Sequence, residues 1–366
     1  MRILFFLGNG FDLNLGMKTS YQDFYRWYLN RYSSHPCIDS LKRNIDANYE
    51  NWSDLECGLG EYSKSINTQE DALCLYRDLT SELSMYLSIQ ERELSLPNGY
   101  KSKIIYDMFH PNTFLRQREI QEVFSPYPIT SDRHLDIITF NYTNTLEQIG
   151  FNNLPMDIQY ERAGKRTITR LIHLHGFTNE RMVLGVNDLS QIANKKWHDS
   201  KKIVRRYIKP IHNDTYKLEH EQDCQRLISS ADVICLYGVS IGKSDSKWWR
   251  IIANHLKRNL NYRLIIFSYN PKIKSTGHYG PDYEDAVDEV KDRFLTAASA
   301  SLEHGIREQI YVSFNKDIFK VPSDASGLRL KQSVSRHSFP RRTLKIHNAP
   351  TSIDFTNSLQ QPLKND

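Results

Sequence analysis

The first residues that could do chemistry follow the opening hydrophobic run RILFFL, which stops at Gly8-Asn9-Gly10 and is followed by Asp12. Glycines let the backbone approach a ligand without a Cβ in the way, and free backbone amides can bind phosphate. The spacing lacks the third glycine of the dinucleotide-binding pattern GxGxxG, because Leu13 stands at that position. The segment therefore fits either a phosphate-binding loop or a simple tight turn.

A second polar group ends the hydrophobic run LDIIT and contains Thr139, Asn141 and Tyr142. In an open α/β sheet, ligands bind beyond the carboxyl ends of the strands, so side chains that emerge there are well placed for binding. Asn141 could hold a ribose hydroxyl or orient a water molecule. An Asx-turn that ends the strand and begins the next helix explains Asn141 equally well.

The third group is His173 and His175, at the end of the run RLIHLH and before Gly176. Alternation along a strand places both histidines on one face. A histidine at a strand terminus can present its imidazole to a cleft and accept a proton near neutral pH, which suits a general base. A structural role is the commoner one for a single histidine. The sequence offers no companion carboxylate or thiol at recognisable spacing, so no metal site is expected here.

The fourth group follows the run DVICL and contains Gly238, Ser240, Gly242 and Asp245. Glycine and small polar side chains after a strand suit a phosphate or the edge of a ribose. Residues 238–242 also match GxSxG, the nucleophile elbow of serine hydrolases. That mechanism needs an acid and then a histidine in later strand-end loops, and no later histidine stands in a recognisable loop of that kind. We therefore do not expect a serine hydrolase.

Two charged segments have both a functional and a structural interpretation. The segment from Lys195 to Lys209 holds seven Lys and Arg side chains. On one continuous helix, Lys201, Arg205 and Lys209 fall in one row, which is either a solvated face or a stripe that contacts nucleic-acid phosphates. The segment WSDLE at residues 52–56 could offer carboxylates to a neighbouring cleft. It is more typical of a capped helix start, where acidic residues are favoured.

The elements that must position these groups are predicted by seven short runs rich in β-branched, leucine and aromatic residues. Most runs are nearly continuous in hydrophobicity, as in strands buried on both faces of a parallel sheet. Helical spacing lies between several of them, notably at residues 246–258 and 283–300, so the pattern predicts an α/β fold. The runs are RILFFLG, LDIITFN, RLIHLH, RMVLGV, DVICLYG, RLIIFSY and QIYVSF.

The order of these patterns predicts three parts of the chain. Residues 18–133 show helical spacing without a convincing strand, and Ser20 with Asp23 resembles a capping box at the start of one helix. We interpret this part as a helical insertion after the first strand. Residues 1–17 and 134–321 would form the sheet-containing core. Residues 322–366 are Ser-, Pro- and Arg-rich and carry most of the net charge of +5, which predicts a flexible basic tail.

Composition places the chain of 366 residues among globular proteins, with 39% hydrophobic and 25% charged residues. No apolar run approaches the roughly 18 residues of a membrane span, and the opening run is too short for a signal peptide. We therefore expect a cytoplasmic protein without membrane contact. The cysteines form no CxxC pair, so reduced thiols are expected rather than a disulfide framework or a structural zinc site; they are Cys37, Cys57, Cys74, Cys224 and Cys235.

Taken together and in order, these segments resemble the AbiH abortive-infection family of bacterial phage-defence proteins. The matching segments are LGNGFDLNLG with the following TSYQDF, then WSDLE, ITFNYTNTLE, HLHG, LGVND and LYGVSIGKSD, and they run from Leu7 to about Asp245. At greater distance, the same order is similar to the Rossmann-like NAD-binding fold of sirtuins. The resemblance implies an antiphage protein that binds NAD or a related nucleotide, and hydrolyses the bond between nicotinamide and ribose.

The resemblance also implies roles for individual residues. Asn141 and His175 would be catalytic, Asn141 by positioning ribose or water and His175 as general base. Thr143 stands where defence-type sirtuin domains often carry an aspartate, and the zinc-binding cysteine pairs of sirtuins are absent from the sequence. The residues expected to contact the nucleotide are Gly8, Asn9, Gly10, Asp12, Thr139, Tyr142, Gly238, Ser240 and Asp245.

Two alternatives stay open. The protein could be a nucleotide-sensing module without catalysis that acts through a protein partner. It could also be an effector that contacts nucleic acid through residues 195–209. A phage-derived trigger and a homo-oligomer are compatible with each of these functions, and none of them requires a metal.

Overall fold

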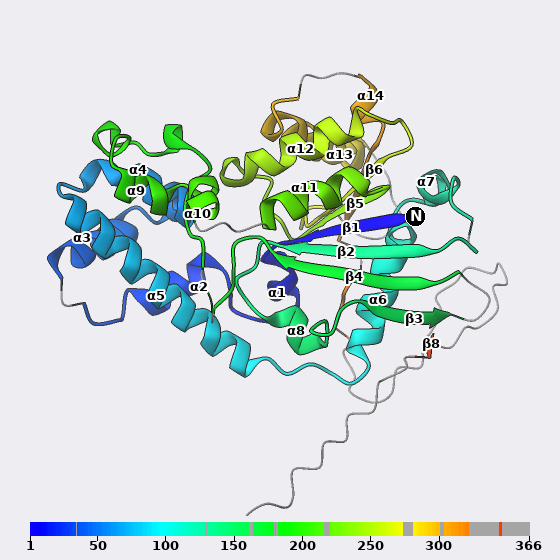
Figure 1. Cartoon of the computed structure of the whole chain (residues 1–366), viewed down its shortest axis with the longest axis horizontal. Helices are drawn as coiled ribbons and strands as arrows, with labels where there is room; N and C mark the ends of the chain where they lie inside the picture. The colour runs from blue at the N-terminus through cyan, green and yellow to red at the C-terminus, as the bar shows by residue number, and fades with distance from the viewer. Residues whose placement is uncertain are drawn as a thin grey trace, which may run out of the picture.

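A mostly parallel sheet forms the centre of this mixed α/β protein (Figure 1). The computed structural model describes residues 1–33, 35–128, 130–160, 164–178, 180, 182–215, 220–273, 281–300, 304–315, 317–321 and 344–345. The strand order is β7-β6-β5-β1-β2-β4-β3-β8. The strands are β1 (Arg2–Leu7), β2 (Arg133–Thr139), β3 (Met156–Tyr160), β4 (Arg166–His173), β5 (Val233–Tyr237), β6 (Arg263–Ser268), β7 (Ile310–Phe314) and β8 (Leu344–Lys345).

The position of β1 creates a crevice at one edge of the sheet. β1 pairs in parallel with β2 on one side and with β5 on the other, so the chain continues in opposite directions from the central strand. Such a reversal leaves an opening beyond the carboxyl ends of the strands, where open α/β sheets bind ligands. β3 pairs antiparallel with β4 and is the exception to the parallel arrangement in this part of the sheet.

Alternate residues of β1 contribute to two cores, one on each face of the sheet. Leu4 and Phe6 belong to a core with helices α11 (His220–Ser230), α12 (Ser246–Leu256) and α13 (Pro281–Ala297). Phe5 and Leu7 belong to a second core on the opposite face. The helices on this second face are α1 (Gly10–Asn14), α6 (Tyr100–Phe109), α7 (Gln117–Phe124) and α8 (Thr145–Ile149). The short helix α14 (His304–Arg307) precedes β7.

A separate helical lobe lies beyond the carboxyl ends of the parallel strands (Figure 1). The lobe contains the third core of the molecule, which is built from the segment after β1 and the segment around residues 182–211. We define this lobe by its helices, which are α2 (Tyr21–Tyr28), α3 (Pro36–Ala47), α4 (Leu55–Tyr62), α5 (Gln69–Glu93), α9 (Lys201–Tyr207) and α10 (Lys209–Thr215). Short 3-10 helices are η1 (Tyr49–Trp52), η2 (Ser63–Ser65), η3 (Pro111–Phe114), η4 (Leu189–Gln191), η5 (Lys195–Trp197) and η6 (Lys243–Asp245).

The helices between β1 and β2 therefore belong to two different bodies. α2 to α5 pack in the helical lobe, whereas buried residues of α6 and α7 pack against the sheet. Ser20 caps α2, because its side chain accepts a hydrogen bond from the Asp23 amide at 3.1 Å. The Asp23 side chain accepts from the Ser20 hydroxyl rather than from the Ser20 amide, so the structure has the N-cap half of the predicted capping box. None of the described helices is both long enough and apolar enough to cross a bilayer.

Two strand predictions differ from the structure. Residues 182–186 of the predicted strand RMVLGV do not join the sheet: Val186 makes an isolated bridge to Ile208, and Leu184 is buried in the core of the helical lobe. Its hydrophobicity reflects that burial. Strand β3 was not predicted, because its residues MDIQY alternate between apolar and polar instead of forming a continuous hydrophobic run. The predicted tail at residues 322–366 lies outside the described residues, except for Leu344–Lys345, which pairs antiparallel with β3 as β8.

Candidate functional site

A cavity of about 730 Å³ lies between the carboxyl ends of the strands and the helical lobe. The segments that follow β1, β2, β4 and β5 all reach it, and helices α4, α5, α10 and α12 supply further lining side chains. Polar side chains in the lining include Asn9, Asp12, Asp54, Glu56, Asn141, Tyr142, Thr143, His175, Lys209, Ser240 and Asp245.

Gly8, Gly10 and Gly238 line the cavity and allow the loop after β1 to cross the loop after β5 with their backbones in contact. The Gly8 amide donates to the Tyr237 carbonyl at 3.0 Å, and the Gly10 amide donates to the Gly238 carbonyl at 2.8 Å. A Cβ on Gly10 would lie 2.5 Å from the Gly238 Cα, and Gly238 has a φ of +66°. The expectation of free amides is therefore wrong for Gly8 and Gly10, because both donate to the neighbouring loop.

Asp12 is the most buried carboxylate in the lining and is only 1% exposed. Its Oδ2 accepts a hydrogen bond from the Thr143 hydroxyl at 2.6 Å. Burial raises the pKa of Asp12 to about 6, although the side chains of Thr143, Thr145 and Asn141 oppose this rise. Oδ1 of Asp12 and Oδ1 of Asn141 are buried and have no hydrogen-bond partner among the described residues.

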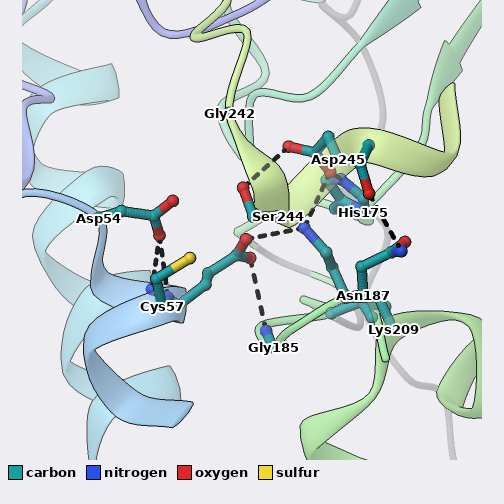
Figure 2. A network of polar contacts seen from close by, with 12 residues as sticks. Asp54, Cys57, His175, Gly185, Asn187, Lys209, Gly242, Ser244 and Asp245 are labelled. Atoms are coloured by element: carbon teal, nitrogen blue, oxygen red, sulfur yellow. Dashed lines mark hydrogen bonds and ion pairs between the residues drawn. The ribbon is translucent and has the colours of Figure 1, made fainter. Parts of the chain in front are cut away.

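Lys209 joins two carboxylates at another part of the cavity wall (Figure 2). Its Nζ lies 2.7 Å from Glu56 Oε2 and 2.9 Å from Asp245 Oδ1. Burial by itself would lower the pKa of Lys209, but the charges of Asp245 and Glu56 raise it above its usual value. Burial likewise opposes the ionisation of Asp245, and the charge of Lys209 nevertheless holds its pKa well below the usual range. Lys209 and Asp245 therefore form a buried ion pair.

Glu56 is the member of this network that titrates near neutral pH. Burial raises its pKa to about 7, while the charge of Lys209 lowers it and that of Asp245 raises it. Its Oε1 accepts hydrogen bonds from the Tyr142 hydroxyl at 3.1 Å and from the Gly185 amide at 3.4 Å. Two carboxylates that share one lysine thus have very different affinities for protons.

His175 is bound to this network through one ring nitrogen (Figure 2). Its Nε2 lies 3.3 Å from Asp245 Oδ1. Burial, and then the charge of Lys209, lower the pKa of His175, so the neutral imidazole is favoured. A neutral ring that donates from Nε2 to Asp245 keeps Nδ1 as an acceptor, and this Nδ1 is buried without a partner among the described residues. That tautomer is the one a general base needs.

The two predicted histidines do not share an environment. β4 ends at His173, so the alternation of the strand does not extend to His175. The ring nitrogens of His173 contact the Asn141 carbonyl at 3.2 Å and Glu147 Oε1 at 2.8 Å. His173 is absent from the cavity lining, whereas His175 belongs to it. Of the two, only His175 is placed to meet a ligand there.

The residues predicted from the sequence meet largely in this one cavity, although their functions stay predictions. Like His173, Thr139 is outside the lining: its hydroxyl donates to the Leu7 carbonyl at 3.3 Å and accepts from the Asn141 amide at 3.1 Å. The predicted residues that line the cavity are Gly8, Asn9, Gly10, Asp12, Asn141, Tyr142, His175, Gly238, Ser240 and Asp245.

Sequence reasoning misplaced Lys209 and left the function of Glu56 open. The single helical row of Lys201, Arg205 and Lys209 is wrong, because α9 ends at Tyr207 and Lys209 begins α10. Lys209 is 3% exposed, whereas Lys201 and Arg205 are exposed, and contact of these with nucleic acid stays a prediction.

Both interpretations of the WSDLE segment hold in the structure. Asp54 caps α4, because its Oδ1 accepts hydrogen bonds from the amides of Glu56 and Cys57, each at 3.0 Å. Asp54 and Glu56 also line the cavity. An aspartate at a helix start with a glutamate two residues later was the available sequence signal for this part of the site, and the burial of that glutamate appears only in the fold.

Comparison with known proteins gives one family. A model of the family described as "Bacteriophage abortive infection AbiH" matches residues 4–269 of the chain. A search of curated proteins found no match. The matched range extends from β1 through β6 and contains every residue that lines the cavity.

Proposed function

The chain belongs to the AbiH family of bacteriophage abortive infection, and from this premise we propose that its cavity binds NAD or a related nucleotide and hydrolyses the bond between nicotinamide and ribose. The protein would then act in antiphage defence by removing a nucleotide that both phage and host require. The proposal includes a Rossmann-like arrangement of the sheet, similar to that of sirtuins.

One observation carries the proposal: three side chains of the same cavity have buried polar atoms without partners among the described residues. They are Asp12 Oδ1, Asn141 Oδ1 and His175 Nδ1. Buried polar groups are nearly always hydrogen-bonded, so unpartnered ones in a cavity favour a ligand that completes them. All three are acceptors in the states favoured above, and ribose hydroxyls and water are donors. The volume of about 730 Å³ is within the usual range for small-molecule sites.

Hydrolysis at this site would need few groups. The bond between the ribose C1′ and the nicotinamide nitrogen breaks, the electron pair leaves with nicotinamide, and a water oxygen forms a bond to C1′. The products are nicotinamide, ADP-ribose and a proton. Asn141 orients the ribose or the water, and His175 Nδ1 accepts the water proton. The Asp12 carboxylate stabilises the positive charge that develops on the ribosyl centre.

The contact between Asp12 and Thr143 supports this assignment. Thr143 occupies the position at which the resembling defence domains often carry an aspartate, and its hydroxyl donates to Asp12 Oδ2. An aspartate at position 143 would face the Asp12 carboxylate at hydrogen-bond distance and repel it. The loop after β1 thus supplies the carboxylate that the loop after β2 lacks.

The test is mass spectrometry of nucleotides before and after incubation with the purified full chain, alone and with extract of phage-infected cells. We expect NAD to be converted to nicotinamide and ADP-ribose. The Asn141→Ala and His175→Gln variants should lose this activity, while His110→Gln, a histidine outside the cavity lining, should keep it.

Two results would count against the proposal. NAD that stays intact in both conditions, and that binds the wild type no better than the two cavity variants, would remove both binding and hydrolysis. Tight binding of NAD without turnover would remove hydrolysis alone and favour the non-catalytic nucleotide sensor.

A further inference from the structure

A cluster of potential metal ligands lies in the helical lobe, apart from the cavity described above. One ring nitrogen of His35 and the sulfur atoms of Cys37 and Cys74 all lie within 4.8 Å of one another. His35 and Cys37 stand at the start of α3, and Cys74 is in the second turn of α5. The spacing of the cysteines in the sequence indicated isolated thiols, but the packing of α3 on α5 brings two of them together.

The chemical types in this cluster select the class of metal. Two thiolates and one imidazole are the ligands that Zn²⁺ prefers, whereas Mg²⁺ and Ca²⁺ prefer oxygen. With Zn–S distances of about 2.3 Å and Zn–N distances of about 2.0 Å, the ligand atoms of a tetrahedral site lie about 3.5 Å apart. Small side-chain rotations would bring ligand atoms now within 4.8 Å to that spacing.

We propose that His35, Cys37 and Cys74 bind one Zn²⁺ ion through three protein ligands. The fourth position would face a second cavity of about 320 Å³, which is lined by His35 and Cys37 among other residues. A water molecule can reach that position from the cavity. Asp71, one turn before Cys74 on α5, also lines this cavity and can accept a hydrogen bond from such a water.

The ion would join the start of α3 to the first turns of α5. Ile38 and Leu41 of α3 already pack in one core with Leu75 of α5. Farther along α5, Leu83 and Leu87 line the main cavity. Zinc would therefore stabilise the helical lobe that forms one wall of that cavity, without contact with its polar residues.

The test uses the full-length protein purified in reducing buffer with Zn²⁺ and then dialysed against metal-free buffer. Elemental analysis should find one zinc per chain in the wild type. Cys37→Ser and Cys74→Ser should weaken zinc binding at least about tenfold. Cys57→Ser is the matched control, because Cys57 is a free, half-buried thiol outside the cluster, and it should bind zinc like the wild type.

A second measurement keeps the test valid if a variant folds poorly. Co²⁺ added to the metal-free wild type should give the visible absorption of a tetrahedral thiolate site, and chelation should lower the unfolding temperature until Zn²⁺ is restored. The proposal is overturned if the wild type binds neither metal, if the Cys57 variant loses zinc equally, or if peptide mapping finds a Cys37–Cys74 disulfide in the reduced preparation.

Discussion

The Thr143 hydroxyl donates a hydrogen bond to Asp12 Oδ2 at 2.6 Å, which ties the loop after β1 to the loop after β2. This contact uses one carboxylate oxygen and leaves Oδ1 without a partner among the described residues. Asp12 is therefore held in one orientation at the cavity wall by a neighbouring strand end. Such fixed orientation is what a carboxylate needs if it is to stabilise charge on a bound ligand.

The first prediction concerns the reaction at this carboxylate. Asp12→Asn should lower the kcat of NAD hydrolysis by about 10²-fold or more, because an amide has nearly the same shape but cannot offset positive charge on the ribosyl centre. NAD binding should change far less than kcat. Single-turnover kinetics and calorimetric titration measure the two quantities separately.

The control for Asp12→Asn is Thr143→Val, which keeps the carboxylate but removes its donor. We expect a smaller loss of kcat, because the charge remains and only its orientation is relaxed. Equal rates for wild type and Asp12→Asn would exclude Asp12 from the chemistry.

The second prediction concerns stability and pH. The pKa of Asp12 is raised from 3.8 to about 6, which corresponds to about 3 kcal/mol. A raised folded-state pKa means that the contribution of Asp12 to stability is fully present below pH 3.8 and is lost as the pH rises through about 6. Asp12→Asn removes this dependence, so the variant should gain up to about 3 kcal/mol relative to wild type between pH 4 and pH 7.

Urea denaturation of both proteins across this pH range provides the measurement. Other carboxyl groups titrate in the wild type and in the variant alike, so the difference in unfolding free energy isolates Asp12. A difference that stays constant with pH would show that Asp12 titrates as an ordinary exposed aspartate.

The parts of the site that could be predicted are those where a strand ends. Asn141 and His175 follow β2 and β4, and hydrophobic runs locate strand ends well because buried parallel strands have few polar residues. Parallel pairing then brings those ends to one edge, so residues far apart in the chain meet there. The mostly parallel sheet could be predicted for the same reason.

The parts that could not be predicted depend on tertiary packing. Lys209 stood in a basic segment that suggested a solvent-exposed row, but the break between α9 and α10 turns it into the cavity. Gly8 and Gly238 matched ligand-binding patterns, but glycine is needed at both positions because the backbones of two loops approach each other closely there. Cys37 and Cys74 showed no metal-ligand spacing, because the two helices that carry them meet only in the folded lobe.

The third prediction tests the buried ion pairs of Lys209. Lys209→Met leaves the carboxylates of Glu56 and Asp245 without their cation. Removal of one member of a buried pair costs about 3–5 kcal/mol, since an uncompensated charge remains. We expect a loss of this size in the unfolding free energy at pH 7.5, measured by urea denaturation.

Two further variants separate charge from packing at Lys209. Lys201→Met, on the exposed face of α9, should change stability by no more than about 0.5 kcal/mol. Lys209→Met combined with Glu56→Gln should recover part of the loss, because only one unpaired carboxylate remains. No recovery in the double variant would indicate lost packing rather than lost charge.

The last prediction uses two glycines of one loop that differ in their surroundings. A Cβ on Gly238 would lie 2.6 Å from the Phe11 amide nitrogen, and the Gly238 φ of +66° is strained for any other residue. A Cβ on Gly242, in contrast, would meet nothing closer than 3.9 Å. Gly238→Ala should destabilise the protein by about 2–4 kcal/mol through overpacking and the left-handed backbone. Gly242→Ala should cost less than about 1 kcal/mol. Thermal and urea unfolding of both variants measure this difference, and equal stabilities would contradict the close crossing of the two loops beneath the cavity.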